Sequence, residues 1–135
     1  MANFEQFDRL ARSLPEVTVR PGIDGRPRYY VRGKFFAAHR DPRPDAIDEV
    51  TGERLDDVIV VRAESVDAAM ALLHERPDLF FTTPHFQGYP GILTRIGWLS
   101  RMDDAELREI VEDAWLTQAP RRLAASYLNE TQQGD

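Results

Sequence analysis

RYYVRGKFFAAHR, residues 28–40, decides the fold of this chain. Two runs rich in aromatic and β-branched residues, Arg28–Arg32 and Phe35–Arg40, are separated by the dipeptide Gly33-Lys34. A two-residue connection that begins with glycine predicts a β-hairpin with a type II′ turn, because glycine supplies the positive φ at the first turn position. Two strands joined by so short a turn must pair antiparallel.

Further strands are predicted on both sides of this hairpin. Val17–Val19 is short and β-branched, and Val58–Val61 is an unbroken apolar run, which is typical of a central strand buried on both faces. Leu79–Thr82 is a short extended piece, and Ile92–Leu99 alternates its side chains between two faces. Residues 41–55 contain two closely spaced prolines and a Thr-Gly turn, so they are predicted to form a loop.

Three helices are predicted from apolar residues at helical spacing. The first follows Asn3, which with Gln6 fits a capping box, and it ends before Pro15. The second is capped by Ser65 and stopped by Pro77. The third begins with Asp103 and Glu106, ends before Pro120, and carries the most regular apolar stripe: Leu107, Ile110, Val111, Ala114 and Trp115.

The expected order is therefore α-β-β-β-β-α-β-β-α. Strands that cluster early without alternating helices favour an α+β fold, a mainly antiparallel sheet with helices packed on it. A length of 135 residues suits one domain, which we expect over residues 1–128. Residues 121–128 are a further helical piece of that domain, and residues 129–135 are expected to be a frayed tail.

Composition excludes several classes of protein. The chain has no cysteine, which rules out a disulfide framework and a thiol nucleophile. No apolar run approaches the roughly 20 residues of a membrane span, and the N-terminus lacks the features of a signal peptide. We therefore expect a cytoplasmic protein with no membrane partner.

The motifs of common enzymes and metal sites are also missing from the sequence. The serines lie in no G-x-S-x-G elbow, the three histidines lack ligand spacing, and the glycines form no phosphate-binding loop. The acidic loop after residue 40 lacks the spacing of an EF-hand. We expect no enzyme activity, no catalytic residue, no metal and no cofactor.

Charge is distributed unevenly along the chain. The whole chain carries 17 basic and 23 acidic residues, a formal net charge of −6. Its basic side chains gather in residues 20–43, a window of net charge +5. On the predicted hairpin, guanidinium groups that grip phosphate alternate with rings that stack on bases, so the sequence suggests a nucleic-acid-binding site. Its members would be Arg28, Tyr30, Arg32, Lys34 and Arg40.

Two alternatives remain open for these segments. Any half-buried hairpin has a polar outward face, so the pattern of residues 28–40 is also that of an ordinary hairpin. The loop 82–91 offers a second candidate site, a small-ligand pocket or enzyme site formed by His85, Tyr89 and Arg95, since loops held by a scaffold often carry binding residues. The same loop could instead tuck Phe86 and Tyr89 over the core.

The chain resembles the MmcQ/YjbR-like family along nearly its whole length. The resemblance rests on the order of short motifs: Phe4…Leu14-Pro15, Gly33–Ala37, Val58–Val61, Arg76-Pro77, His85…Tyr89, a strand to Trp98, and Asp103–Leu107 opening a helix that runs to Ala114-Trp115. It implies a compact α+β domain of the double-wing type, whose members are commonly labelled DNA-binding and have no agreed catalytic residues.

These observations give three hypotheses of function. The first is DNA binding through the basic hairpin, which we expect to be weak and salt-dependent because the acidic third helix would repel phosphate. The second is a protein- or peptide-interaction module that uses an open sheet edge. The third is the small-ligand pocket. The chain is expected to be a monomer or a weak dimer.

Overall fold

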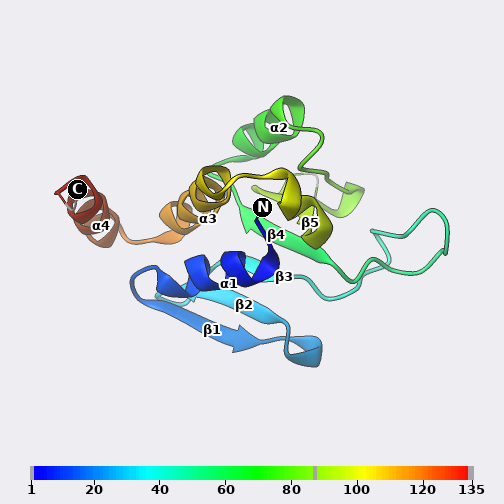
Figure 1. Ribbon diagram of the computed structural model, residues 1–135, viewed down its shortest axis with the longest axis horizontal. Coiled ribbons are helices and arrows are strands. Elements are labelled where there is room, and N and C mark those ends of the chain that lie inside the picture. Colours follow the sequence, from blue (N-terminus) through cyan, green and yellow to red (C-terminus); the bar gives the residue numbers. More distant parts are fainter. Residues whose placement is uncertain (1, 87, 134–135) are drawn as a thin grey trace.

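The computed structural model describes residues 2–86 and 88–133. Its architecture is α+β, as the sequence predicts, with a five-stranded antiparallel sheet and α-helices on one side (Figure 1). The elements in chain order are α1 (Phe4–Ser13), β1 (Val17–Pro21), η1 (Ile23–Gly25), β2 (Pro27–Val31), β3 (Lys34–His39), β4 (Val58–Arg62), α2 (Val66–Glu75), η2 (Pro84–Phe86), β5 (Gly91–Arg95), η3 (Ile96–Arg101), α3 (Asp104–Gln118) and α4 (Arg121–Gln133).

The sheet is a meander in which every strand pairs with its neighbour in sequence. The strand order is β1-β2-β3-β4-β5 and all four pairings are antiparallel. A bulge interrupts the pairing of β2 and β3, because Tyr29 lies opposite Ala37 whereas Tyr30 lies opposite Phe35. The extra residue, Phe36, is fully buried together with Ala37 in the main core.

The hairpin is present, but its turn is displaced by one residue from the predicted position. Val31 pairs with Lys34, so the two turn residues are Arg32 and Gly33, with φ angles of 48° and 81°. Two consecutive positive φ angles define a type I′ turn, and the predicted type II′ turn at Gly33-Lys34 is wrong. Lys34 is therefore the first residue of β3, opposite Val31 on the helix side of the sheet, and not a turn residue.

Local sequence determines the helix boundaries. Asn3 and Gln6 form the predicted capping box of α1, and Asp103 and Glu106 form that of α3. The Ser65 side chain accepts a hydrogen bond from the backbone of Ala68 at the start of α2. These three N-terminal predictions are confirmed.

Two predictions near the C-terminus are wrong in extent. The strand expected over Ile92–Leu99 ends at Arg95, which pairs with Val58, the first residue of β4. Beyond that point the neighbouring strand offers no further partner, and the chain turns into the 3₁₀ helix η3. At the end of the chain α4 continues to Gln133, so much of the expected frayed tail is helical, and residues 134–135 lie outside the described residues.

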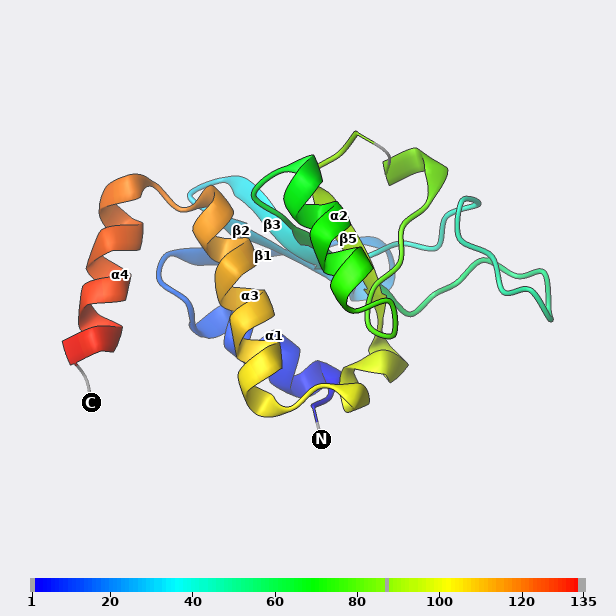
Figure 2. The same cartoon turned by 90° about the horizontal axis from the view of Figure 1, so that it is seen from above.

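The main core lies between the sheet and the helices α1, α2 and α3, which lie together on one face of the sheet (Figure 2). Trp115 of α3 is fully buried in this core, and its indole nitrogen donates a hydrogen bond to the Pro15 carbonyl. Tyr127 attaches α4 to the same helix, with its ring 5.0 Å from that of Trp115 and its hydroxyl bonded to Glu112.

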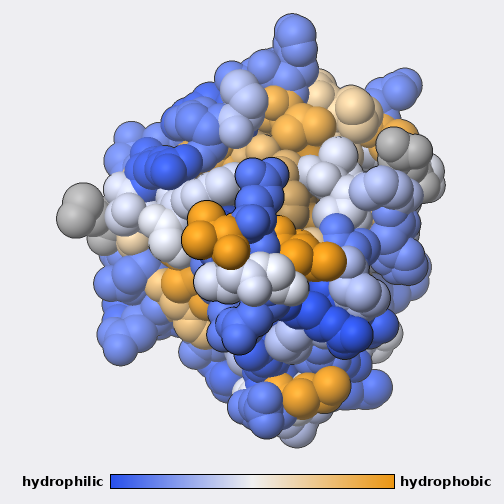
Figure 3. All heavy atoms as spheres, turned by 90° about the vertical axis from the view of Figure 1, so that its right-hand side faces the viewer, coloured by the Kyte–Doolittle hydropathy of each residue, from blue (hydrophilic) through white to orange (hydrophobic). Residues whose placement is uncertain are grey.

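A long arm, residues 41–57, projects from the sheet between β3 and β4 (Figure 2). It is closed by a bridge between Ile47 and Arg54 and by a turn in which the Asp48 carboxylate accepts two backbone hydrogen bonds. Val50 at the turn is 94% exposed, and apolar side chains are visible among polar ones on the face toward which the arm projects (Figure 3). The arm confirms the predicted loop.

Candidate functional site

The face of the sheet opposite α1, α2 and α3 carries the candidate site, and we call it the uncovered face. The alternation of side chains places on it Arg20, Arg28, Tyr30, Phe35, Ala38, Arg40, Val58, Val60, Arg62, Leu93 and Arg95. A small second apolar cluster lies here, and it consists of strand, arm and loop residues. None of the α-helices in residues 2–86 and 88–133 contributes to that cluster.

All three arginines predicted to contact nucleic acid are already paired with carboxylates. Arg28 donates to Asp41 at 2.8 Å, and Arg32 donates to Glu16 at 2.7 Å. The structure therefore does not bring the predicted set together: Arg28, Tyr30 and Arg40 share the uncovered face, Arg32 lies in the turn, and Lys34 lies toward the other face.

The ion pair of Arg40 with Asp45 is the most deeply buried of these three pairs. The Arg40 side chain is only 9% exposed, and one of its terminal nitrogens donates to both carboxylate oxygens of Asp45 at 2.7 Å. The Thr83 hydroxyl donates to the same carboxylate at 2.7 Å. Burial alone would raise the pKa of Asp45, but the hydrogen bonds from Arg40 and Thr83 lower it below its ordinary value. The network attaches the arm to the loop that follows Leu79.

Two arginines that sequence reasoning left out of the site have no carboxylate partner among the described ion pairs, and both stack on rings of this face. The Arg20 guanidinium lies 4.9 Å from the centre of the Tyr30 ring. That of Arg62 lies 5.1 Å from the centre of the Tyr89 ring. When the Gln118 amide is oriented with its oxygen toward Arg62, that oxygen accepts hydrogen bonds from the guanidinium at 3.1 Å. These distances are typical of cation–π contacts.

Aromatic rings continue across the uncovered face from Tyr30. The Phe35 ring lies 5.8 Å from that of Tyr30 at an interplanar angle of 71°. Sequence reasoning left Phe35 out of the site, although alternation could have found it, because a turn at Gly33-Lys34 also places Phe35, opposite Arg32, on the face of Tyr30. With the turn at Arg32-Gly33, strand alternation alone places both rings on one face.

Phe35 also forms one wall of a cavity of about 250 Å³, which we call the ring pocket. Its other lining residues are Val60, His85, Phe86 and Tyr89. The structure thus brings together two of the three residues of the predicted small-ligand site. The third, Arg95, lies at the opposite end of β5 from Gly91 and pairs with Asp57 at 3.2 Å.

A larger groove of about 670 Å³ lies between α2 and α3. Its lining is mainly apolar, from residues such as Ala68, Leu72 and Ile110, and its charged members are Arg62, Glu64, Glu75 and Asp113. Burial raises the pKa of Asp113, and the like charges of Glu109 and Glu112 add to the effect. This carboxylate therefore lies in surroundings that favour its neutral form.

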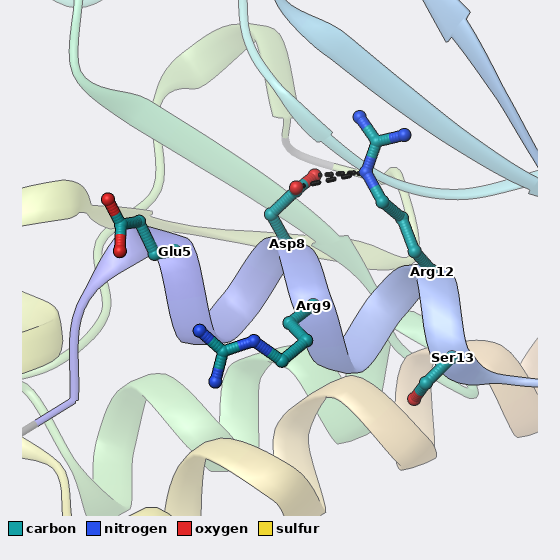
Figure 4. Close-up of a pocket in the computed structure, with 5 residues that line it drawn as sticks. All are labelled: Glu5, Asp8, Arg9, Arg12 and Ser13. Atoms are coloured by element: carbon teal, nitrogen blue, oxygen red, sulfur yellow. Dashed lines mark hydrogen bonds and ion pairs between the residues drawn. The ribbon is translucent and has the colours of Figure 1, made fainter.

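The outer face of α1 has a third depression, lined by Glu5, Asp8, Arg9, Arg12 and Ser13 (Figure 4). Its side chains come from one helix, and only those of Asp8 and Arg12 meet, whereas those of Glu5, Arg9 and Ser13 point in other directions. Arg12 bonds to Asp8 at 2.8 Å, and Asp8 also accepts a hydrogen bond from the buried Tyr29 hydroxyl at 2.6 Å. These contacts connect the helix to the sheet, and we assign no ligand to this surface.

Two absences hold for the part of the chain that the structure describes. No group of three or more histidine, aspartate or glutamate side chains is arranged to hold a metal ion there. None of the helices within it combines the length and the apolar character needed to cross a bilayer.

Comparison with known proteins identifies the family. The family model described as YjbR matches residues 12–117, which is more than half of the chain. The chain belongs to the YjbR family. It is 31% identical over 132 residues to the uncharacterized proteins Rv2570 and MT2646 of Mycobacterium tuberculosis and Mb2600 of Mycobacterium bovis. Each alignment covers 95% of this chain and 97% of the relative. No solved structure matches it significantly.

The YjbR match confirms the resemblance drawn from the sequence motifs. It covers the whole sheet, α2 and nearly all of α3, and it includes the uncovered face and the ring pocket, whereas most of α1 and all of α4 lie outside it. The mycobacterial relatives are themselves described as uncharacterized proteins. The double-wing description and DNA binding remain predictions, so function must be argued from this face.

Proposed function

We propose that this YjbR-family chain is a binding domain, without a catalytic step, that holds single-stranded nucleic acid across the uncovered face. The observation that carries the proposal is the row formed by Arg20, Tyr30 and Phe35, in which a guanidinium and two rings follow one another on an open sheet surface. Rings on such a surface stack on bases of any sequence, and guanidinium groups contact the phosphates between them.

The charge pattern supports a single strand over a duplex. Among the residues that the structure describes, the uncovered face has five arginines. Three of them pair with Asp41, Asp45 and Asp57, which leaves Arg20 and Arg62 for phosphate. Duplex affinity depends mainly on the number of phosphates neutralised, and two are few. Stacking requires bases whose flat faces are accessible, as in an unpaired strand.

A fluorescence anisotropy titration tests the proposal. The probes are a labelled single-stranded oligonucleotide and its duplex, each at two salt concentrations. The single strand should bind more tightly, with a slope of log K against log salt of about −1.4 for two phosphate contacts. Tyr30→Ala should weaken binding about ten-fold, since one stacked base contributes about 1–3 kcal/mol.

The matched control is Arg101→Ala, because Arg101 stands 5.2 Å from the centre of the Trp98 ring in a similar cation–π pair outside the uncovered face. It removes one arginine from the chain but none from the proposed site, so binding should be unchanged. Equal losses in both variants, or no binding of the single strand at low salt, would refute the proposal.

A second candidate function is the binding of a protein segment in the groove between α2 and α3. The observation that favours it is an apolar lining combined with the carboxylates of Glu64 and Glu75, which together match an amphipathic helix that carries lysine or arginine. A lysine-bearing amphipathic peptide should bind the chain, and Leu72→Glu should abolish that binding. Failure of the wild-type chain to bind such a peptide rejects this candidate.

A further inference from the structure

The ring pocket is the part of the uncovered face whose shape restricts a ligand most closely. Val60 of β4 and Phe35 of β3 line it from the sheet, while His85, Phe86 and Tyr89 line it from the loop after α2. Phe86 stands nearly perpendicular to Tyr89, with ring centres 5.5 Å apart and an interplanar angle of 84°. It meets the His85 ring in the same manner at 5.7 Å and 75°.

The walls of the ring pocket are held in place from behind. The Arg40 guanidinium lies 5.0 Å from the centre of the Phe86 ring, and the bidentate contact with Asp45 fixes that guanidinium. The Tyr89 ring packs so closely on Gly91 that a Cβ at that position would lie 2.7 Å from a ring carbon. A pocket with fixed walls loses little conformational entropy when a ligand enters.

Volume and chemistry together define the ligand class. A cavity of about 250 Å³ is smaller than the roughly 300–1,000 Å³ of sites for drug-sized molecules, so it suits a single planar ring system. The aromatic walls favour a flat ligand that can stack. Arg62, which stands over Tyr89, supplies a positive charge beside the pocket, and guanidinium groups bind phosphate well.

We propose that the ring pocket takes one unstacked nucleobase and that Arg62 contacts the phosphate attached to it. The proposal rests on the proposed function, since Phe35 belongs both to the ring pocket and to the row with Tyr30. A strand stacked on Tyr30 would pass Phe35 and place its next accessible base at the pocket. The same chemistry is offered by a free nucleotide, and the experiment separates the two sources.

The experiment compares three probes by calorimetry and by amide chemical shifts: adenosine monophosphate, an oligoadenylate strand, and an abasic strand of equal length. If the proposal holds, the oligoadenylate binds at least ten-fold more tightly than the abasic strand and shifts the amides of Val60 and Tyr89. If the abasic strand binds as tightly as the oligoadenylate, the pocket does not receive a base and the proposal is overturned.

Two variants change the pocket in opposite ways. Tyr89→Ala removes a wall, and Val60→Phe fills the pocket from its floor while every ring of the wall remains. Both should lower oligoadenylate affinity about ten-fold, whereas the control Arg101→Ala should not. Arg62→Ala should weaken binding and reduce the salt slope by about 0.7, the value for one phosphate contact on a single strand. Unchanged affinity in Val60→Phe overturns the proposal.

The failures of the two proposals are distinguishable. If Tyr30→Ala weakens strand binding and Val60→Phe does not, the pocket proposal is overturned while the strand-binding function stands. If adenosine monophosphate binds and changes the amide chemical shift of Val60 but neither strand binds, the strand-binding function is rejected. The same result supports a nucleobase in the pocket, with a free nucleotide as its source. If no probe binds, both are rejected.

Discussion

Replacing Asp45 by asparagine tests whether the buried ion pair with Arg40 stabilises the attachment of the arm. The substitution keeps the size of the side chain and one oxygen that can accept from Thr83. It removes the negative charge opposite a guanidinium that is only 9% exposed. The outcome is therefore a buried positive charge without a counter-ion, which is one of the few single changes that destabilise proteins strongly.

The magnitude follows from the burial of the two partners. Breaking a fully buried pair costs about 3–5 kcal/mol, and here Asp45 keeps 17% of its side chain exposed while asparagine keeps part of the hydrogen bonding. We expect the free energy of unfolding to fall by about 3 kcal/mol. For a domain of this size, that loss lowers the melting temperature by about 10 °C.

The assay is urea and thermal unfolding followed by tryptophan fluorescence, with Glu16→Gln as the control. Glu16 pairs with Arg32 at the surface, where the side chains are 45% and 54% exposed, so its loss should cost less than about 1 kcal/mol. The pKa of Asp45 is lowered in the fold, so its stabilisation is complete above the unfolded pKa and disappears as the pH falls through the folded one. The gap between wild type and Asp45→Asn should accordingly narrow below about pH 4.

A loss of less than about 1 kcal/mol in Asp45→Asn at pH 7 would refute this reasoning. The double variant Arg40→Met/Asp45→Leu gives a second check, because apolar replacement of both partners removes the unpaired charge. It should be more stable than Asp45→Asn alone. If it is less stable by the sum of the two single losses, the pair is not energetically coupled.

Three more outcomes are expected. Tyr29→Phe should lower the free energy of unfolding by about 1–2 kcal/mol in a denaturant titration, because Asp8 loses the hydrogen bond from a buried hydroxyl. Burial and this hydrogen bond also raise the pKa of Tyr29. The ionisation of Tyr29 in an alkaline absorbance titration should therefore coincide with unfolding. Gly33→Ala should lower the free energy of unfolding by about 1 kcal/mol in the denaturant titration, because φ is +81° at this position. The control Gly97→Ala, which has open space around it, should lower the free energy of unfolding by less. Equal losses in the two variants contradict the turn assignment. Asp113→Asn should stabilise the fold by about 0.5 kcal/mol at pH 7. Because the folded pKa of Asp113 is raised, this gain should begin to shrink as the pH falls through the folded pKa and should disappear below the unfolded pKa. A loss of stability at pH 7 contradicts the assignment.

Much of the fold could be predicted because its signals are local. Capping residues such as Asn3 and Ser65 accept hydrogen bonds from backbone groups within three residues, so they define helix starts without knowledge of the rest of the chain. The extent of β5 could not be predicted in this way. It ends at Arg95 because β4 begins at Val58, and such pairing depends on another part of the sequence.

The candidate site was harder to predict for the same reason. Alternation along the hairpin correctly placed Arg28 and Tyr30 on one face, but it could not show that Arg32 and Gly33 form the turn, which takes Arg32 out of the strand. The partners of the arginines lie far away in sequence or in loops. Nothing in the local pattern of residues 28–40 shows that Glu16 would neutralise Arg32.

The pairing of the arginines has a consequence for any function of the basic segment. A guanidinium that packs against the sheet loses part of its hydration. A carboxylate from the arm replaces the lost contacts with water, so the guanidinium needs no ligand. Arg28 and Arg40 are satisfied by Asp41 and Asp45, both of which belong to that arm. A phosphate group would have to displace a carboxylate that is already bound, so these two side chains contribute little to affinity. The charge of residues 20–43 therefore overstates the attraction for nucleic acid, and recognition by this face must depend on rings and on Arg20 and Arg62.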